Sequence, residues 1–175
     1  MNNSISIGSA FPSKVYSIIE IPKGTKNKYE YDETLDAIKL DRVVHSSVVY
    51  PVNYGFIPET RAADGDHLDV LVLSADQIFP GCVVEIRPIG VLKMSDDKGE
   101  DWKIVGVIVA DPLSDVKQQI TDIDDAQKAE LEHFFSVYKQ LENKSVTIHG
   151  WGDREEAYKA IQSAHETYRN ESHNE

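Results

Sequence analysis

Short apolar runs separated by turn residues occupy the first two-thirds of the chain. Runs of about four to eight residues, rich in β-branched and aromatic side chains, are typical of β-strands. Pro22-Lys23-Gly24 ends the first run, and in the next one Lys28 and Glu30 alternate with Tyr29 and Tyr31. The pattern predicts strands at residues 14–21, 26–32, 38–44, 70–73, 82–92 and 104–110.

The final third of the chain changes to a helical period. Apolar side chains recur at the spacing of one helix face, at Leu131, Phe134, Phe135, Tyr138 and Leu141. Residues 125–141 are therefore predicted to form an amphipathic helix. A short strand is expected at residues 146–148. Asp153, followed three residues later by Glu156, resembles a capping box and predicts the start of a second helix.

Residues 50–58 combine aromatic side chains with proline and glycine, and we expect ordered but irregular backbone there. Closely spaced strands followed by two helices favour an antiparallel barrel, or a strongly curved sheet, with the helices packed at its side. The chain has 175 residues, no repeat and no linker, so it is predicted to form one domain over residues 1–175.

Composition and charge narrow the class of protein. Hydrophobic residues make up 41% and charged residues 27%, as in soluble globular proteins. No run approaches the roughly 20 consecutive apolar residues of a membrane span, and residues 1–10 do not resemble a secretory signal. The formal net charge of −12 would repel nucleic acid. A single cysteine fits a reducing cytoplasm. We therefore expect a cytoplasmic protein with neither a membrane nor a nucleic-acid partner.

The first candidate for chemistry is the acidic segment that precedes the apolar run at residues 71–73. If that run is a strand, its edge holds Asp69 while the preceding loop presents Asp64 and Asp66, which point to the same side of an extended chain. Converging carboxylates repel one another, and Mg²⁺ or Ca²⁺ relieves the repulsion because these ions prefer carboxylate oxygens. A solvated acidic turn has the same composition, so this segment alone leaves both interpretations open.

A second acidic cluster lies between two predicted strands and comprises Asp96, Asp97, Glu100 and Asp101. Two acidic loops facing one cavity can hold several metal ions, and two ions about 3.5–4 Å apart can activate a water for in-line displacement. Basic residues lie among aromatic ones at Lys28, Arg42, Lys103 and Lys139. Taken singly, Lys28, Arg42 and Lys139 would mostly be solvated surface charges. Together with tyrosine hydroxyls they suit phosphate oxygens, and the combination indicates metal-assisted phosphoryl hydrolysis.

Five segments, in order, resemble the soluble family I inorganic pyrophosphatases. They are residues 20–24 (EIPKG), 50–58 (YPVNYGFIP), 64–70 (DGDHLDV), 99–103 (GEDWK) and 133–139 (HFFSVYK). The resemblance implies a mainly β protein with α-helices, namely a five-stranded antiparallel β-barrel similar to the oligonucleotide-binding (OB) fold with two flanking helices. It also implies cytoplasmic, Mg²⁺-dependent hydrolysis of pyrophosphate to two phosphates, in bacterial members usually by a homohexamer.

The resemblance also implies roles for individual residues. Asp66 matches the general base that acts on the bridging water. The matching metal ligands are Asp64, Asp69, Asp96 and Asp101. The phosphate-contacting residues are Lys28, Arg42, Tyr54, Lys103, Tyr138 and Lys139. Carboxylates that support the site from farther out are Glu20, Glu30 and Asp97.

His67 departs from the family pattern, because proline usually stands at this position. A proline would fix φ at about −65° and stiffen the loop, so Asp66 and Asp69 must be positioned here by other means. His67 is either a tolerated loop residue or a hydrogen-bond partner of Asp66 that shifts the pKa of that carboxyl.

Two functions of other classes remain open at this point. A barrel that binds calcium only for stability would release no phosphate from pyrophosphate. An oligonucleotide-binding module would need a basic face, which the net charge of −12 disfavours.

Overall fold

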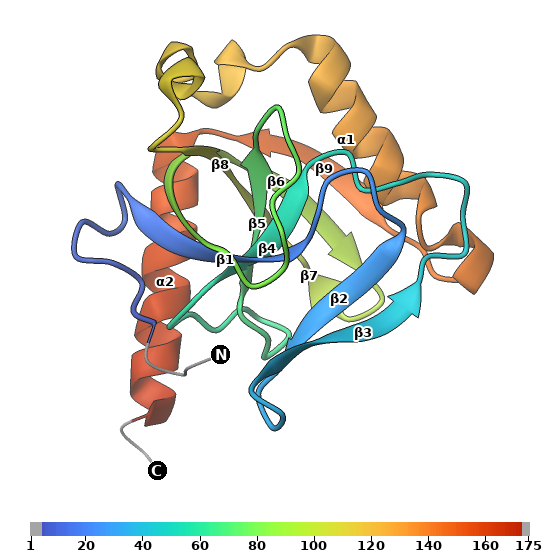
Figure 1. Ribbon diagram of the computed structural model, residues 1–175, viewed down its shortest axis with the longest axis horizontal. Helices are drawn as coiled ribbons and strands as arrows, with labels where there is room; N and C mark the ends of the chain where they lie inside the picture. The colour runs from blue at the N-terminus through green and yellow to red at the C-terminus, as the bar shows by residue number, and fades with distance from the viewer. Residues whose placement is uncertain (1–4, 173–175) are drawn as a thin grey trace.

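Five strands pair edge to edge into a closed ring (Figure 1). The computed structural model describes residues 5–172. The ring consists of β1 (Val15–Ile21), β4 (Asn53–Ile57), β5 (Leu68–Leu73), β8 (Lys103–Ile108) and β6 (Val83–Asp96), and β6 pairs back onto β1. The predicted five-stranded closed sheet is therefore confirmed. Its β5–β8 junction is parallel, however, which corrects the expectation of an entirely antiparallel barrel. The chain reverses direction on entering β6 and again on entering β8, so β8 returns in the direction of β5.

The remaining elements extend the ring or cover it. A separate hairpin is formed by β2 (Asn27–Asp32) and β3 (Ala37–Val43), and β6 additionally pairs with β7 (Gly99–Glu100) and β9 (Thr147–Gly152). The helices are α1 (Asp125–Val137) and α2 (Arg154–Ser172), and the short 3₁₀ turns are η1 (Pro112–Val116), η2 (Ile120–Asp122) and η3 (Gln140–Glu142). In Figure 1 the β2–β3 hairpin projects from the ring on the side away from α2.

Strand β4 lies within residues 50–58, where irregular backbone was predicted. Gly55 explains why this strand needs an unusual composition. A Cβ atom at Gly55 would lie 2.0 Å from the carbonyl oxygen of Ile18, so only glycine allows β1 and β4 to approach this closely. The first predicted helix is also shorter than expected, because α1 ends at Val137 and the chain continues into η3.

The two helices cover opposite faces of the sheet. Along β5, Leu71 and Leu73 pack in the cluster that α1 joins, whereas Val70 and Val72 pack in the cluster that α2 joins. Strand β5 is therefore buried on both faces, which explains its nearly continuous apolar sequence.

The start of α2 has the predicted capping box. The backbone N–H of Glu156 donates to Oδ1 of Asp153 (2.9 Å), and the N–H of Asp153 donates to Oε2 of Glu156 (3.1 Å). Neither α2 nor any other helix within residues 5–172 has the length and apolar character needed to cross a membrane.

Candidate active site

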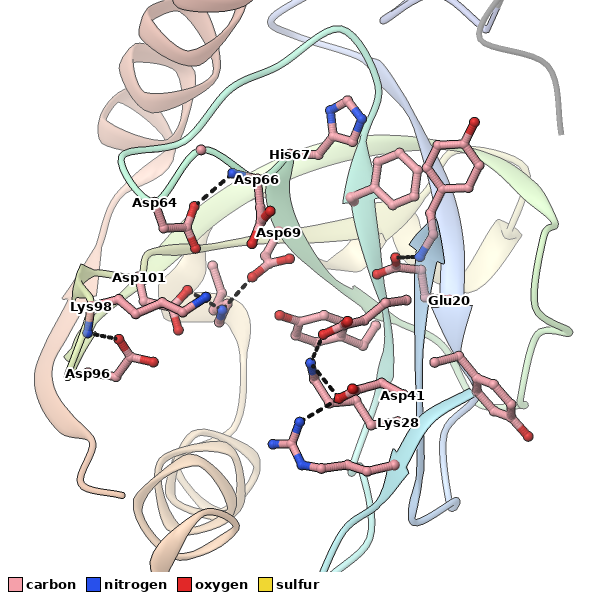
Figure 2. Close-up of a pocket in the computed structure, with 18 of the residues that line it drawn as sticks. Glu20, Lys28, Asp41, Asp64, Asp66, His67, Asp69, Asp96, Lys98 and Asp101 are labelled. Carbon is pink, nitrogen blue, oxygen red and sulfur yellow. Dashed lines mark hydrogen bonds and ion pairs between the residues drawn. The ribbon is translucent and has the colours of Figure 1, made fainter. Parts of the chain in front are cut away.

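The β2–β3 hairpin, the acidic loop before β5 and the β6–β7 hairpin surround one cavity of about 640 Å³. Every site residue predicted from the sequence lines this cavity: Glu20, Lys28, Glu30, Arg42, Tyr54, Asp64, Asp66, Asp69, Asp96, Asp97, Asp101, Lys103, Tyr138 and Lys139. Figure 2 shows the carboxylates of the two acidic loops on one side and residues of the hairpin on the other. The structure thus brings the whole predicted set together, while their individual roles remain predictions.

The parallel register of β5 and β8 places Asp69 beside Lys103. Val70 is opposite Ile104, so the residues that precede them lie next to each other. The Lys103 ammonium contacts the carboxylates of both Asp69 and Asp101, and its side chain is only 3% exposed. Burial alone would lower the pKa of Lys103, but the two carboxylates outweigh it and raise that pKa above its usual range. Lys103 is therefore a buried, permanently charged group at the back of the cavity.

The acidic loop before β5 is a compact turn. The N–H of Asp66 donates to Oδ1 of Asp64 (3.1 Å), and the N–H of Ala62 donates to the carbonyl oxygen of Asp66 (2.8 Å). Gly65 between the two aspartates has a φ of +89°, which favours glycine. This arrangement orients the Asp64 carboxylate through the backbone of Asp66.

Asp66 has the electrostatic character of a proton acceptor. Partial burial, and then the charge of Asp64, raise the pKa of the Asp66 carboxyl, while the nearby Lys98 opposes this increase. A carboxylate whose pKa is raised binds a proton more readily, which is the change a general base needs at neutral pH.

On the β6–β7 hairpin, Asp96 is held from two directions. Its Oδ2 accepts from Nζ of Lys139 (2.8 Å) and its Oδ1 from the N–H of Lys98 (2.8 Å). Burial raises the pKa of the Asp96 carboxyl, but these contacts outweigh burial and leave the pKa lowered. Lys139 follows the last turn of α1, so this ion pair joins the helix to the hairpin.

The basic residues of the β2–β3 hairpin are already paired with carboxylates. Lys28 is opposite Arg42 across the two strands, and the Lys28 ammonium contacts Glu30. Arg42 forms ion pairs with Asp41 (2.6 Å) and Glu142 (3.0 Å). These pairs hold the cationic ends in fixed positions along the cavity wall.

Glu20 lies beneath the hairpin and is 7% exposed. Its Oε1 accepts from the N–H of Tyr31 (2.7 Å), which ties β1 to β2. Burial raises the pKa of Glu20 to about 8, despite that hydrogen bond. The buried carboxyl is therefore mainly protonated at neutral pH.

The donor chemistry of the cavity fits a hard divalent cation. Carboxylates from two loops line it, and carboxylate oxygens are the ligands that Mg²⁺ and Ca²⁺ prefer. As the side chains stand, no three acidic, histidine or cysteine residues among those described form a group that could hold an ion. The fit therefore rests on the type of donor and on the shared cavity.

Several residues that line the cavity were not predicted as site residues, among them Asp41, Arg61 and Lys98. Asp41 was missed because β3 contains a bulge there. Lys28 is opposite Arg42, but Tyr29 is opposite Leu40, which leaves Asp41 without a strand partner. A bulge changes the direction of neighbouring side chains, so strict alternation does not identify them.

His67 does not form the hydrogen bond to Asp66 that one of the two interpretations required. Its Nδ1 lies 2.9 Å from the carbonyl oxygen of Thr60, and its Nε2 lies 3.2 Å from Oε1 of Glu33. Its ring also stacks on Phe56, with centroids 4.7 Å apart. His67 is therefore held by Thr60, Glu33 and Phe56 and not by Asp66.

Residues 17–169 match the family model of inorganic pyrophosphatases. The chain belongs to the inorganic pyrophosphatase family. An inorganic pyrophosphatase from Thermus thermophilus is 46% identical over 169 residues, covering 95% of this chain and 97% of that protein. One from Halobacterium salinarum is also 46% identical, over 165 residues, covering 94% of this chain and 93% of that protein.

Solved structures of the inorganic pyrophosphatase family support the fold. The T. thermophilus crystal structure matches with a TM-score of 0.92 at 45% identity, covering 96% of this chain and 99% of that one. A structure from Anaplasma phagocytophilum, named an inorganic phosphatase, matches with a TM-score of 0.93 at 39% identity, covering 95% and 99%. The predicted fold class is therefore confirmed, apart from the parallel β5–β8 junction.

Proposed function

We propose that this chain hydrolyses inorganic pyrophosphate to two phosphates in a Mg²⁺-dependent reaction, with Asp66 as the general base. One observation carries the proposal: the carboxylates of two loops and the basic residues of the hairpin line a single cavity, in a chain of the inorganic pyrophosphatase family. Family membership supports a divalent metal in general, and Mg²⁺ is the part that we propose.

Asp64, Asp69, Asp96 and Asp101 would hold the metal ions. Bound divalent cations supply charge neutralisation for pyrophosphate and lower the pKa of a coordinated water. The chain's own contribution is to collect these carboxylates from two loops that β5, β6 and β8 hold rigidly. Lys103 reduces the repulsion between Asp69 and Asp101, which makes their close approach possible.

The basic and tyrosine side chains would bind the phosphate oxygens of the substrate: Lys28, Arg42, Tyr54, Lys103, Tyr138 and Lys139. Ammonium and guanidinium groups form charge-assisted hydrogen bonds to phosphate, and arginine can do so with two parallel N–H groups. The existing ion pairs of Arg42 and Lys139 orient these groups before substrate arrives, so less side-chain entropy is lost on binding.

Asp66 would accept the proton of the attacking water. As the water oxygen bonds to one phosphorus atom, the bond from that phosphorus to the bridging oxygen breaks, and the second phosphate leaves. The raised pKa of the Asp66 carboxyl supports this role. Glu20, Glu30 and Asp97 would support the surrounding structure, and the hydrogen bond from the backbone N–H of Tyr31 to Glu20 is an example.

We further propose a cytoplasmic homohexamer. The support is the family resemblance, together with apolar side chains such as Phe79, Leu113 and Val116, each of which is at least 70% exposed in the single chain. Light scattering after gel filtration should give six times the chain mass of 19.7 kDa. A mass equal to that of one chain would contradict the assembly.

The main experiment measures phosphate release from pyrophosphate. We expect release with Mg²⁺ and none in excess chelator, and full activity in chelator would refute the metal requirement.

Asp66→Asn should slow turnover by about 10²–10⁴-fold, with a smaller defect at high pH where hydroxide replaces the base. The matched control is Asp125→Asn, because the Asp125 side chain on α1 is fully exposed. Its rate of turnover should remain within twofold of wild type. A pH–rate profile that Asp66→Asn leaves unchanged would count against Asp66 as the base.

A further inference from the structure

We propose that Arg61 is a positioning residue that fixes the turn carrying Asp64 and Asp66. This inference rests on the proposed function, because it concerns how the metal-binding and base carboxylates of that site are held. Arg61 is absent from the set of residues that the family resemblance assigned, and its side chain reaches the turn from the rim of the cavity.

The Arg61 guanidinium joins three segments that are distant in sequence. Its Nη1 donates to the carbonyl oxygen of Gly65 (3.3 Å) and to Oε1 of Glu33 (3.2 Å), which lies between β2 and β3. Its Nε donates to Oε2 of Glu171 on α2 (3.1 Å), and its carbon Cζ lies 5.8 Å from the ring centroid of Tyr168. The hairpin, the acidic turn and α2 therefore meet at one side chain.

Arg61 can serve as a fixed point because it is anchored itself. Its backbone N–H donates to the carbonyl oxygen of Ala164 in α2 (2.8 Å), and its side chain is only 20% exposed. Burial tends to lower the pKa of Arg61, but Glu33 and Glu171 outweigh it, so the group remains charged. A charged donor strengthens the hydrogen bond to the Gly65 carbonyl.

One peptide group connects Arg61 to the chemistry. The carbonyl oxygen of Gly65 accepts from Arg61, and the N–H on the other side of the same planar peptide, that of Asp66, donates to Oδ1 of Asp64. Rotation of this peptide would release the Asp64 carboxylate and turn the backbone that carries Asp66. Glycine offers little resistance to such a rotation, so the bond from Arg61 adds a constraint to the backbone bonds that close the turn on Ala62.

His67 does not replace Arg61 as the partner of Glu33 at neutral pH. The Thr60 carbonyl can only accept a hydrogen bond, so Nδ1 of His67 carries the ring proton. Burial lowers the pKa of His67, and in the neutral ring Nε2 is an acceptor that faces another acceptor. Glu33 is therefore attracted to Arg61, while the ring of His67 stacks on Phe56.

The test compares Arg61→Met with Glu171→Gln. The first variant keeps most of the side-chain volume but loses every guanidinium bond, whereas the second weakens only the anchor on α2 and leaves the Gly65 bond. Mg²⁺ binding is measured by calorimetry on chelator-treated protein without pyrophosphate, followed by kcat, KM and the pH–rate profile. For Arg61→Met we expect the Mg²⁺ dissociation constant to rise about tenfold, kcat to fall and its pH profile to change, with KM within threefold. For Glu171→Gln the Mg²⁺ dissociation constant, kcat and KM should each remain within twofold of wild type.

Arg61→Lys covers the case in which Arg61→Met does not fold. Lysine keeps the charge and the stem but cannot bond several acceptors in one plane, so it should also weaken Mg²⁺ binding. A folded Arg61 variant with Mg²⁺ binding within twofold of wild type would overturn the proposal. So would an equal loss in Glu171→Gln, because the effect would then come from the packing of α2. If wild type binds Mg²⁺ but releases no phosphate, the proposed function fails while the binding comparison still decides the role of Arg61.

Discussion

Glu20 gives a prediction whose size follows from the structure. Its pKa is raised from 4.5 to about 8, so between these values the folded chain binds a proton that the unfolded chain has lost. The free energy of unfolding therefore falls as pH rises through this window, at about 1.4 kcal/mol per pH unit, and the cost is constant above pH 8. Between pH 4.5 and about pH 8 the free energy of unfolding therefore falls by about 5 kcal/mol in total.

Glu20→Gln removes this cost, because glutamine stays neutral and its Oε1 can still accept the hydrogen bond from Tyr31. The variant should match wild type closely at pH 4.5 and become more stable than wild type as pH rises. Between pH 5 and pH 8.5 we expect its advantage in unfolding free energy to grow by about 4 kcal/mol.

The assay is urea unfolding of metal-free protein at several pH values. Protein concentration is kept constant, because dissociation of an assembly would shift the midpoint. Glu85→Gln, at an exposed position of β6, is the control for replacing a glutamate by glutamine. If the difference in unfolding free energy between Glu20→Gln and wild type does not change with pH, burial does not perturb the pKa of Glu20. That result would refute the reasoning.

Two further predictions concern packing and substrate binding. Gly55→Ala should reduce the unfolding free energy by about 3 kcal/mol or more in urea titrations, because its Cβ would overlap the Ile18 carbonyl oxygen. At Gly24 a φ of +84° strains alanine but no atom lies within 4 Å of the added Cβ, so a loss in Gly55→Ala no larger than that in Gly24→Ala would contradict the overlap. Arg42→Lys should raise KM for pyrophosphate about tenfold, because lysine loses the planar fork and the bidentate contact with Glu142. Metal activation should be unchanged in Arg42→Lys, and the reverse pattern would move Arg42 to the metal site.

Local patterns in the sequence predicted the elements that have a regular apolar period or a capping motif of their own. Strand β1 and helix α2 appear where the apolar period and the capping residues place them. Strand β4 was missed because its sequence reflects a close approach to β1. Glycine is needed at position 55, and of the flanking aromatic residues Tyr54 packs against the cluster that α1 joins, while Phe56 stacks on His67. The parallel β5–β8 junction could not be predicted either, because nothing within either strand specifies its partner.

The site shows the same division between local and non-local information. Residue types indicated two acidic clusters, and the resemblance to the family implied the full set of carboxylates and bases that line the cavity. The contacts that orient them come from distant parts of the chain: Arg61 bonds Glu33, 28 residues away, and Glu171, 110 residues away. An arginine in a loop has no periodicity or neighbouring motif that would reveal such partners. The acidic turn is held by local bonds, such as that from the N–H of Ala62 to the carbonyl oxygen of Asp66, and Arg61 adds the bond that reaches the central peptide of the turn from its side chain.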